Sequence, residues 1–255
     1  MTTLIAWGNV HTHFPFHDIP AELVPANLLT LNHDNPRVKQ RWQCRRLAHF
    51  LLWQLLKTAE KPTALLAQIS RTETDRPQFP LSDFDFNISH SGDWVAVILH
   101  ISPLGEKSAV GIDIESPSKE RPYLALLEHF ASAEEITWFQ QQTNPKSAFY
   151  RIWCLREAVL KSQGVGIAKL SEVTHQPETL HIFSAHCPRG QLCFTDELPF
   201  YLAYFVNQES STLPQCFVWS DHALVSQQMS DGVCYEVNSS NKIEKIRSSS
   251  HISKG

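Results

Sequence analysis

Three charged side chains lie close together in the stretch 147–167, which has the apolar spacing of an amphipathic helix with Gly164 as its stop. Glu157 and Lys161 are four residues apart and therefore share one helix face, and Arg156 directly precedes them. A carboxylate with two cations on a helix that otherwise faces a core is either a structural ion pair or a site for an anion and a metal ion. Taken alone, the helix favours the ion pair.

A second group of charges lies on a predicted strand. The stretch 110–115, Val-Gly-Ile-Asp-Ile-Glu, alternates with the period of two that puts its apolar side chains on one sheet face. Asp113 and Glu115 then share the other face, where they repel each other unless a positive charge lies between them. Carboxylates of this kind are suitable ligands for Mg²⁺, which takes one or two of them together with water and phosphate oxygens. The alternative is an acidic strand end that faces solvent.

Ser89 and His90 belong to a predicted hairpin over residues 84–99. Residues 84–88 alternate as in a half-buried strand, Ser91-Gly92-Asp93 is typical of a turn, and a continuous apolar strand follows. We expect the hairpin tip to carry Ser89 and His90. Hydroxyls, exposed backbone N–H groups and an imidazole at a turn suit phosphate contacts, although a structural histidine remains the alternative.

A basic helix is predicted to begin at Asn35-Pro36, with Asn as N-cap and Pro in the first turn, and to end near Lys57. Its first half carries a cluster of cations, namely Arg37, Lys39, Arg41, Arg45 and Arg46. Like charges four residues apart are slightly destabilising. The cluster is therefore either a solvated face or the binding surface for a polyanion.

The rest of the sequence predicts the helices and strands that would position these charged residues. We expect a strand at 4–7, a short helix at 122–130 and a strand-rich region at 170–206. Ser132 and Glu135 fit a capping box, which leaves Glu134 without a structural role. From residue 208 the chain becomes linker-like. Short strands are expected at 217–219 and 233–237, and disorder from residue 238 onward.

Composition narrows the class of protein. The chain has 255 residues and a formal net charge of −4, which argues against nucleic acid or an anionic membrane as its main partner. Its six cysteines show no Cys-x-x-Cys pair, so we expect reduced, mostly buried thiols. No signal peptide or membrane-spanning stretch is predicted, and the expected compartment is the cytoplasm. His11, His13 and His17 are expected to be loop residues, because their spacing suits no metal site.

Together the basic helix, the Ser-His hairpin, the paired carboxylates and the Glu/Lys helix form a coherent set. Cations would hold a phosphorylated ligand, carboxylates would hold Mg²⁺ against it, and a further carboxylate would accept a proton. From the residues alone, the prediction is metal-assisted transfer from a phosphorylated ligand.

In these motifs the chain resembles the 4′-phosphopantetheinyl transferases, specifically the double-length type. The resemblance covers roughly residues 35–206. It rests on blocks that match in order: the basic helix with Arg46, Arg76-Pro77 followed by residues 86–91, residues 110–115, Phe130 with Glu134, and residues 153–161 with Gly164 and Gly166.

The resemblance implies an α+β fold of two similar halves related by a pseudo-twofold axis, with coenzyme A in the cleft between them. The corresponding division is residues 1–108, residues 109–207 and a C-terminal extension, residues 208–255. It also implies a monomer that takes the phosphopantetheine group of coenzyme A and attaches it to a serine of an apo acyl or peptidyl carrier protein, releasing 3′,5′-ADP.

By the same resemblance, each site residue has an implied role. Mg²⁺ would be held by Asp113, Glu115 and Glu157. Coenzyme A would be held by Arg46, Arg76, Ser89, His90 and Lys161. Glu157, assisted by Glu134, would deprotonate the carrier serine.

Two positions depart from the family pattern. Arg156 stands where the family usually has Lys, and Asp75 stands where it usually has Gly before the basic residue. Arginine is bulkier than lysine and is never deprotonated. These departures leave open a module that binds coenzyme A or a carrier without turnover. A Mg²⁺-dependent phosphohydrolase that uses the same metal site is a third alternative. Which carrier or pathway is served is not encoded in the motifs.

Overall fold

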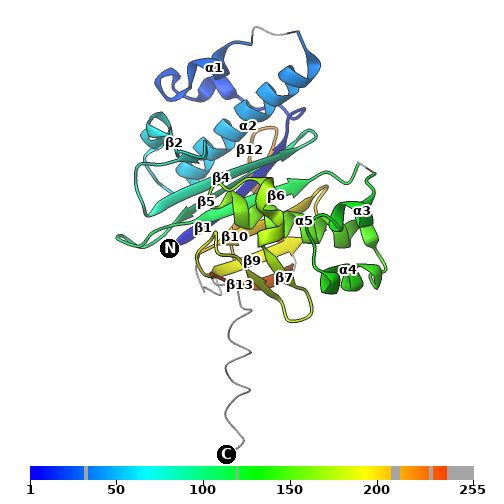
Figure 1. The fold of residues 1–255 in the computed structure, drawn as a ribbon. Helices are drawn as coiled ribbons and strands as arrows, with labels where there is room; N and C mark the ends of the chain where they lie inside the picture. The colour runs from blue at the N-terminus through cyan, green and yellow to red at the C-terminus, as the bar shows by residue number, and fades with distance from the viewer. Residues whose placement is uncertain (32–33, 119, 208–212, 230–231, 240–255) are drawn as a thin grey trace, which may run out of the picture.

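Two mixed β-sheets, each covered on its outer face by one long helix, make up the fold (Figure 1). The computed structural model describes residues 1–31, 34–118, 120–207, 213–229 and 232–239. A sheet with one long helix thus occurs twice, which confirms the expected α+β class and its two similar halves. Across the described ranges, no helix is long and apolar enough to cross a bilayer.

The first sheet has the strand order β12-β11-β1-β5-β4, with β1 antiparallel to β5 and parallel to β11. Its strands are β1 (Thr2–Asn9), β4 (Phe84–Ser91), β5 (Trp94–Ile101), β11 (Gln215–Ser220) and β12 (Ala223–Ser226). The predicted hairpin is β4 and β5, but its turn consists only of Gly92, with φ +58°, and Asp93. The expectation that Ser89 and His90 lie at the tip was therefore wrong, because β4 continues to Ser91.

The second sheet has the order β6-β10-β9-β13-β8-β7. Its strands are β6 (Val110–Glu115), β7 (Thr174–Gln176), β8 (His181–Phe183), β9 (Gly190–Thr195), β10 (Tyr201–Val206) and β13 (Val233–Asn238). A separate small hairpin of β2 (Ser70–Arg71) and β3 (Pro77–Gln78) precedes β4.

Helix α2 (Pro36–Thr58) covers the first sheet and α5 (Pro145–Lys161) covers the second (Figure 1). The side chain of Asn35 caps α2, as predicted, and that of Asn144 caps α5. Shorter helical segments are η1 (Phe16–Asp18), η2 (Ala21–Leu23), α1 (Ala26–Leu29), η3 (Thr63–Gln68), α3 (Tyr123–Leu127), α4 (Ala133–Gln140) and η4 (Ile167–Glu172). The capping box of Ser132 and Glu135 is present at the start of α4.

The inner faces of the two sheets pack against each other. Ile5 and Ile98 of the first sheet share one buried cluster with Ile112 and Leu202 of the second. The alternation in β6 explains this arrangement: its apolar residues face the other sheet, while Gly111 and Asp113 face α5. A Cβ atom on Gly111 would lie 1.9 Å from the carbonyl oxygen of Ala158, so only glycine allows β6 and α5 to approach this closely.

Side chains rather than carbonyl groups join β4 to β6 at the seam between the sheets. Four polar residues at alternate positions of β4 accept the backbone N–H groups that β6 would otherwise leave unpaired. The pairs are Asp85 Oδ2 with Val110 (2.8 Å), Asn87 Oδ1 with Ile112 (3.1 Å), Ser89 Oγ with Ile114 (3.1 Å) and Ser91 Oγ with Ser116 (3.0 Å). We refer to these four bonds as the seam ladder; it fixes the register of β4 against β6.

Residues beyond 207 contribute to both sheets. The short strands expected at 217–219 and 233–237 are confirmed as β11 and β13. The expected disorder at the end of the chain concerns mainly residues 240–255, which lie outside the described residues. These strands connect the C-terminal extension to each half.

The prediction of six reduced cysteines was wrong for two of them. Cys193 and Cys234 face each other across β9 and β13 and form a disulfide. They are 41 residues apart in the chain, so only the register of the strands brings them together. The other four, Cys44, Cys154, Cys187 and Cys216, are buried free thiols as expected.

Candidate active site

Three elements bring Asp113, Lys161 and Ser89 into contact. Lys161 ends α5, and its Nζ lies 2.7 Å from Oδ1 of Asp113 on β6. The same ammonium donates to Oγ of Ser89 on β4 at 2.9 Å, and Ser89 donates to Oδ1 of Asp113 at 3.1 Å. The seam ladder therefore ends in the predicted site, because the same strand register that joins the two halves aligns these three side chains.

Glu157 lies one turn before Lys161 and is 7 % exposed. The pKa of its carboxyl group is raised to about 7, first by burial and then by the negative charges of Asp113 and Glu115, while Lys161 opposes the rise. Burial by itself would lower the pKa of Lys161, but Asp113 and Glu157 outweigh it and raise that pKa. A carboxyl group with a pKa near 7 is suited to accept a proton at neutral pH.

Two carboxylate oxygens in this site are buried without a hydrogen-bond partner, Oδ2 of Asp113 and Oε1 of Glu157. Buried polar atoms are normally satisfied, so a pair of such oxygens on neighbouring acids suits a cation. Glu115, at the end of β6, accepts a hydrogen bond from Ser91 at 2.9 Å and lies 3.7 Å from Arg121. Within the described ranges, no three His, Cys, Asp or Glu side chains converge as a preformed metal cluster. The donor set thus fits a cation held partly by a ligand.

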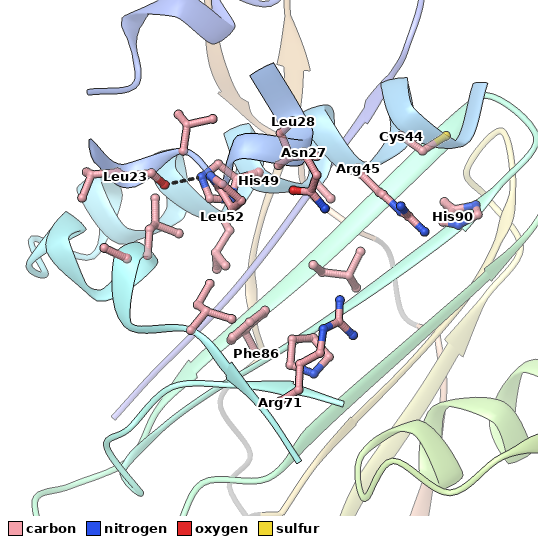
Figure 2. A pocket seen from close by; sticks show the side chains of 18 of the residues that line it. Leu23, Asn27, Leu28, Cys44, Arg45, His49, Leu52, Arg71, Phe86 and His90 are labelled. Carbon is pink, nitrogen blue, oxygen red and sulfur yellow. Dashed lines mark hydrogen bonds between the residues drawn. The ribbon is translucent and has the colours of Figure 1, made fainter. Parts of the chain in front are cut away.

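A cavity of about 590 Å³ lies beside this site, between α2, β4 and the segment around α1. Arg45 reaches it from α2, Arg71 from β2 and His90 from β4 (Figure 2). Its deeper wall is apolar and includes Leu52 and Phe86. Cations near an apolar pocket of this size suit a phosphorylated ligand with a flat apolar part.

His90 connects the cavity to the carboxylates, because it follows Ser89 on β4 and faces the opposite way. Desolvation lowers the pKa of His90, and the positive charges of Lys161, Arg41 and Arg45 lower it further. The imidazole therefore lies among positive charges, which a bound anion would partly neutralise.

Arg46 and Arg76, the two arginines predicted to hold phosphates, have other contacts. The guanidinium of Arg46 packs 4.1 Å from the centre of the Phe16 ring and 4.4 Å from that of Trp42. Arg76 makes two hydrogen bonds to Asp85, at 2.9 and 2.7 Å, and a third to the carbonyl oxygen of Val110 at 3.0 Å. Arg46 thus holds the start of the chain onto α2, and Arg76 joins the two halves.

Arg156 points into the second core and is 0 % exposed. Its guanidinium donates to Oε2 of Glu135 at 2.6 Å and to the carbonyl oxygen of Leu170 at 3.2 Å. Oε1 of Glu135 lies 3.0 Å from Nδ1 of His175. Burial opposes ionisation of Glu135, but Arg156 and His175 lower its pKa to about 2. Arg156 is therefore the centre of a buried ion pair.

Glu134 lies on the exposed side of α4, in a shallow hollow with Trp138, Gln176 and Glu178. The structure does not bring it together with Asp113, Glu157 and Lys161. Asp75 is exposed and lies 3.2 Å from Arg71. Its φ of +64° is the left-handed conformation that glycine adopts most easily, which fits the family's usual glycine at this position.

The sequence did not single out Arg71 or the seam ladder, and it pointed to Arg46 where the structure places Arg45 at the cavity. The alternating polar residues at 85, 87, 89 and 91 were a detectable signal, because a half-buried strand does not require four hydrogen-bonding side chains on its second face. No comparable signal distinguished Arg45 from Arg46, since both lie on the same basic turn.

Known proteins provide an independent comparison. The model of the 4′-phosphopantetheinyl transferase superfamily matches residues 109–223. A putative 4′-phosphopantetheinyl transferase of Haemophilus influenzae is 59 % identical over 238 residues, which cover 93 % of this chain and 100 % of that protein.

More distant relatives match part of the chain. The 4′-phosphopantetheinyl transferase gsp of Aneurinibacillus migulanus is 36 % identical over 92 residues, 34 % of this chain and 35 % of that protein. The 4′-phosphopantetheinyl transferase Sfp of Bacillus subtilis is 32 % identical over 105 residues, 40 % of this chain and 43 % of that protein. The relative that is 59 % identical over nearly the whole chain defines the class of protein as a transferase. The chain belongs to the 4′-phosphopantetheinyl transferase superfamily.

Proposed function

We propose that this chain transfers the 4′-phosphopantetheine group of coenzyme A to a serine of an apo acyl or peptidyl carrier protein and releases 3′,5′-ADP. The observation that carries the proposal is the contact of Lys161 with Asp113 beside the buried acid Glu157, next to a cavity lined by cations. A diphosphate that bridges the cavity and this site would meet positive charge along its length.

Asp113 and Glu157, with Glu115 at the strand end, are proposed to hold Mg²⁺. When bound, Mg²⁺ would neutralise charge on the diphosphate of coenzyme A. Lys161 donates hydrogen bonds to the same phosphate region and stabilises the charge that develops on it. The orphaned oxygens of Asp113 and Glu157 support this assignment.

In the proposed reaction, the carrier serine oxygen forms a bond to the β-phosphorus, and the bond from that phosphorus to the oxygen of 3′,5′-ADP breaks. The serine proton passes to Glu157, the buried carboxylate beside Asp113 and Lys161. We assign the proton transfer to Glu157 alone, because Glu134 lines a different hollow.

Arg45, Arg71 and His90 are proposed to bind the phosphate-bearing adenosine part of coenzyme A, and the apolar wall its base. Arg46 and Arg76 are proposed to stabilise the fold around this site rather than to bind coenzyme A. The guanidinium group of Arg46 contacts aromatic rings, and that of Arg76 pairs with Asp85. Removing a hydrogen bond to a charged group costs about 1.5–3 kcal/mol, or roughly tenfold or more in binding.

The test is incubation with coenzyme A, Mg²⁺ and a panel of apo carrier proteins, followed by mass spectrometry of the carrier. A mass gain of one phosphopantetheine, dependent on the carrier serine, is expected. Lack of any gain across acyl and peptidyl carriers would refute the proposal. In the same assay Arg45→Ala and Arg71→Ala should raise KM for coenzyme A about tenfold. The control variant Arg46→Ala should mainly lower the melting temperature.

Proposals for the oligomeric state, the partners and the compartment of the protein rest on its charge and its thiols. We propose a monomer that acts on carrier proteins without nucleic acid or membrane, supported by the net charge of −4. We propose the cytoplasm as its compartment; the four free thiols support this, and the Cys193–Cys234 disulfide is evidence against it. Neither departure from the family pattern favours the alternative of a non-catalytic module, because Arg156 has a buried partner and Asp75 pairs with Arg71.

A further inference from the structure

The hydroxyl group of Ser89 makes every hydrogen bond that a serine side chain can make. It donates to Oδ1 of Asp113 at 3.1 Å and accepts from the backbone N–H of Ile114 at 3.1 Å and from Nζ of Lys161 at 2.9 Å. A hydroxyl group has one donor and two acceptor positions. Ser89 is also only 3 % exposed, so a phosphate group could bind it only by displacing one of these partners.

The neighbouring residue has the opposite properties. His90 is exposed and lines the cavity beside Arg45 (Figure 2). Ser89 faces β6 and α5, where its hydroxyl group bonds Asp113 and Lys161. Alternate residues of a strand point to opposite sides, so one dipeptide can serve two functions. His90 is available to the ligand, and Ser89 is committed to the carboxylate and the ammonium group.

We propose that Ser89 is a positioning residue for the metal-binding carboxylate rather than a ligand of coenzyme A, an inference that rests on the proposed function. By holding Oδ1 of Asp113 together with Nζ of Lys161, Ser89 leaves Oδ2 of Asp113 as the oxygen available to a cation. Fixing one carboxylate oxygen by hydrogen bonds orients the other, as outer partners of metal ligands commonly do. The seam ladder places Ser89 beside Asp113, because the backbone N–H of Ile114, the residue after Asp113, donates to Oγ of Ser89.

The test separates binding of coenzyme A from binding of the cation. The full chain and the variants Ser89→Ala, His90→Ala and Asn87→Ala are titrated with coenzyme A in EDTA by calorimetry. They are then titrated with Mn²⁺, in the presence of coenzyme A, by electron paramagnetic resonance. Asn87→Ala is the matched control, since it removes the rung of the ladder to Ile112 and a 3.5 Å contact with the carbonyl oxygen of Lys161, but no contact with the Asp113 carboxylate or Nζ of Lys161.

We expect Ser89→Ala to keep the metal-free affinity for coenzyme A within about twofold and to weaken Mn²⁺ binding by about tenfold or more. In turnover assays kcat should fall while KM for coenzyme A stays near the wild-type value. Ser89→Thr, which keeps the hydroxyl group, should recover part of the Mn²⁺ affinity. His90→Ala should show the reverse pattern, with weaker coenzyme A binding and unchanged Mn²⁺ binding.

Two results would overturn the inference. One is a metal-free loss of coenzyme A affinity in Ser89→Ala as large as that in His90→Ala. The other is an equal loss of Mn²⁺ affinity in Ser89→Ala and Asn87→Ala, which would mean general loosening of the seam. Both measurements need no carrier protein. Wild-type protein that binds both ligands but modifies no carrier would therefore contradict the proposed function and leave the assignment of Ser89 to be judged by these titrations.

Discussion

Arg156 donates to Glu135 across 2.6 Å inside the second core, although it directly precedes Glu157 in the sequence. Successive residues of an α-helix point about 100° apart, so α5 presents Glu157 to the seam and Arg156 to α4. The arginine that departs from the family pattern is thus built into the packing of α5 and does not touch the carboxylates of the site.

Replacing Arg156 should therefore lower the free energy of unfolding. Arg156→Met leaves Glu135 buried without its cation, and breaking such a pair costs about 3–5 kcal/mol. Urea unfolding followed by circular dichroism measures this loss. The double variant Arg156→Met with Glu135→Gln should recover part of the stability, because no unpaired charge remains. A single variant with wild-type stability would show that the pair contributes nothing.

Gly111 should tolerate no side chain. In Gly111→Ala the new Cβ would meet the carbonyl oxygen of Ala158, so α5 must move away from β6 and carry Glu157 away from Asp113. We expect a loss of about 3 kcal/mol in unfolding free energy and of most transfer activity. Gly166→Ala is the control, because nothing lies within 4 Å of its Cβ position, and it should behave as wild type. Equal effects of the two substitutions would contradict the close-approach argument.

The pKa of Glu157 predicts how stability changes with pH in the absence of metal. The folded pKa is raised from the usual 4.5 to about 7, so the folded state holds a proton that the unfolded state has lost. The contribution is complete below pH 4.5 and is lost as pH rises through about 7, on the order of 3 kcal/mol in all.

Comparing Glu157→Gln with wild type in EDTA, by urea unfolding between pH 5 and pH 8, isolates this contribution. The wild type should lose more stability over that range than the variant. Mg²⁺ should raise the melting temperature of the wild type more at pH 8 than at pH 5, because the ionised carboxylate is its ligand. If the unfolding free energies of the two proteins in EDTA changed equally with pH, the pKa of Glu157 would not be raised in the folded state.

The Cys193–Cys234 disulfide predicts the number of reactive thiols. Protein purified without reductant, unfolded and treated with iodoacetamide should gain four alkyl groups, from Cys44, Cys154, Cys187 and Cys216. Treatment with a reductant first should raise the number to six. Six groups without reductant would show that the pair is reduced in the compartment where the protein was made.

The sequence by itself determined the local features and the family. Helix α2 begins at Asn35-Pro36 because a side-chain cap and a proline suit a helix start, and β6 alternates because its apolar face packs against the other sheet. Short-range chemistry of this kind is written in neighbouring residues. The motifs around Asp113 and Glu157 likewise predicted a cation site, because their residue types suit a cation.

The tertiary structure decided which of two neighbouring residues faces the site. Arg45 reaches the cavity while Arg46 packs against aromatic rings, and His90 faces the cavity while Ser89 faces Asp113. The pairing of Cys193 with Cys234 and the seam ladder have the same origin. The orientation of Arg45 and Arg46 depends on how α2 packs on the first sheet. The other features depend on how strands far apart in the chain are aligned, and a shift of one residue in that register would turn each strand side chain to the opposite face.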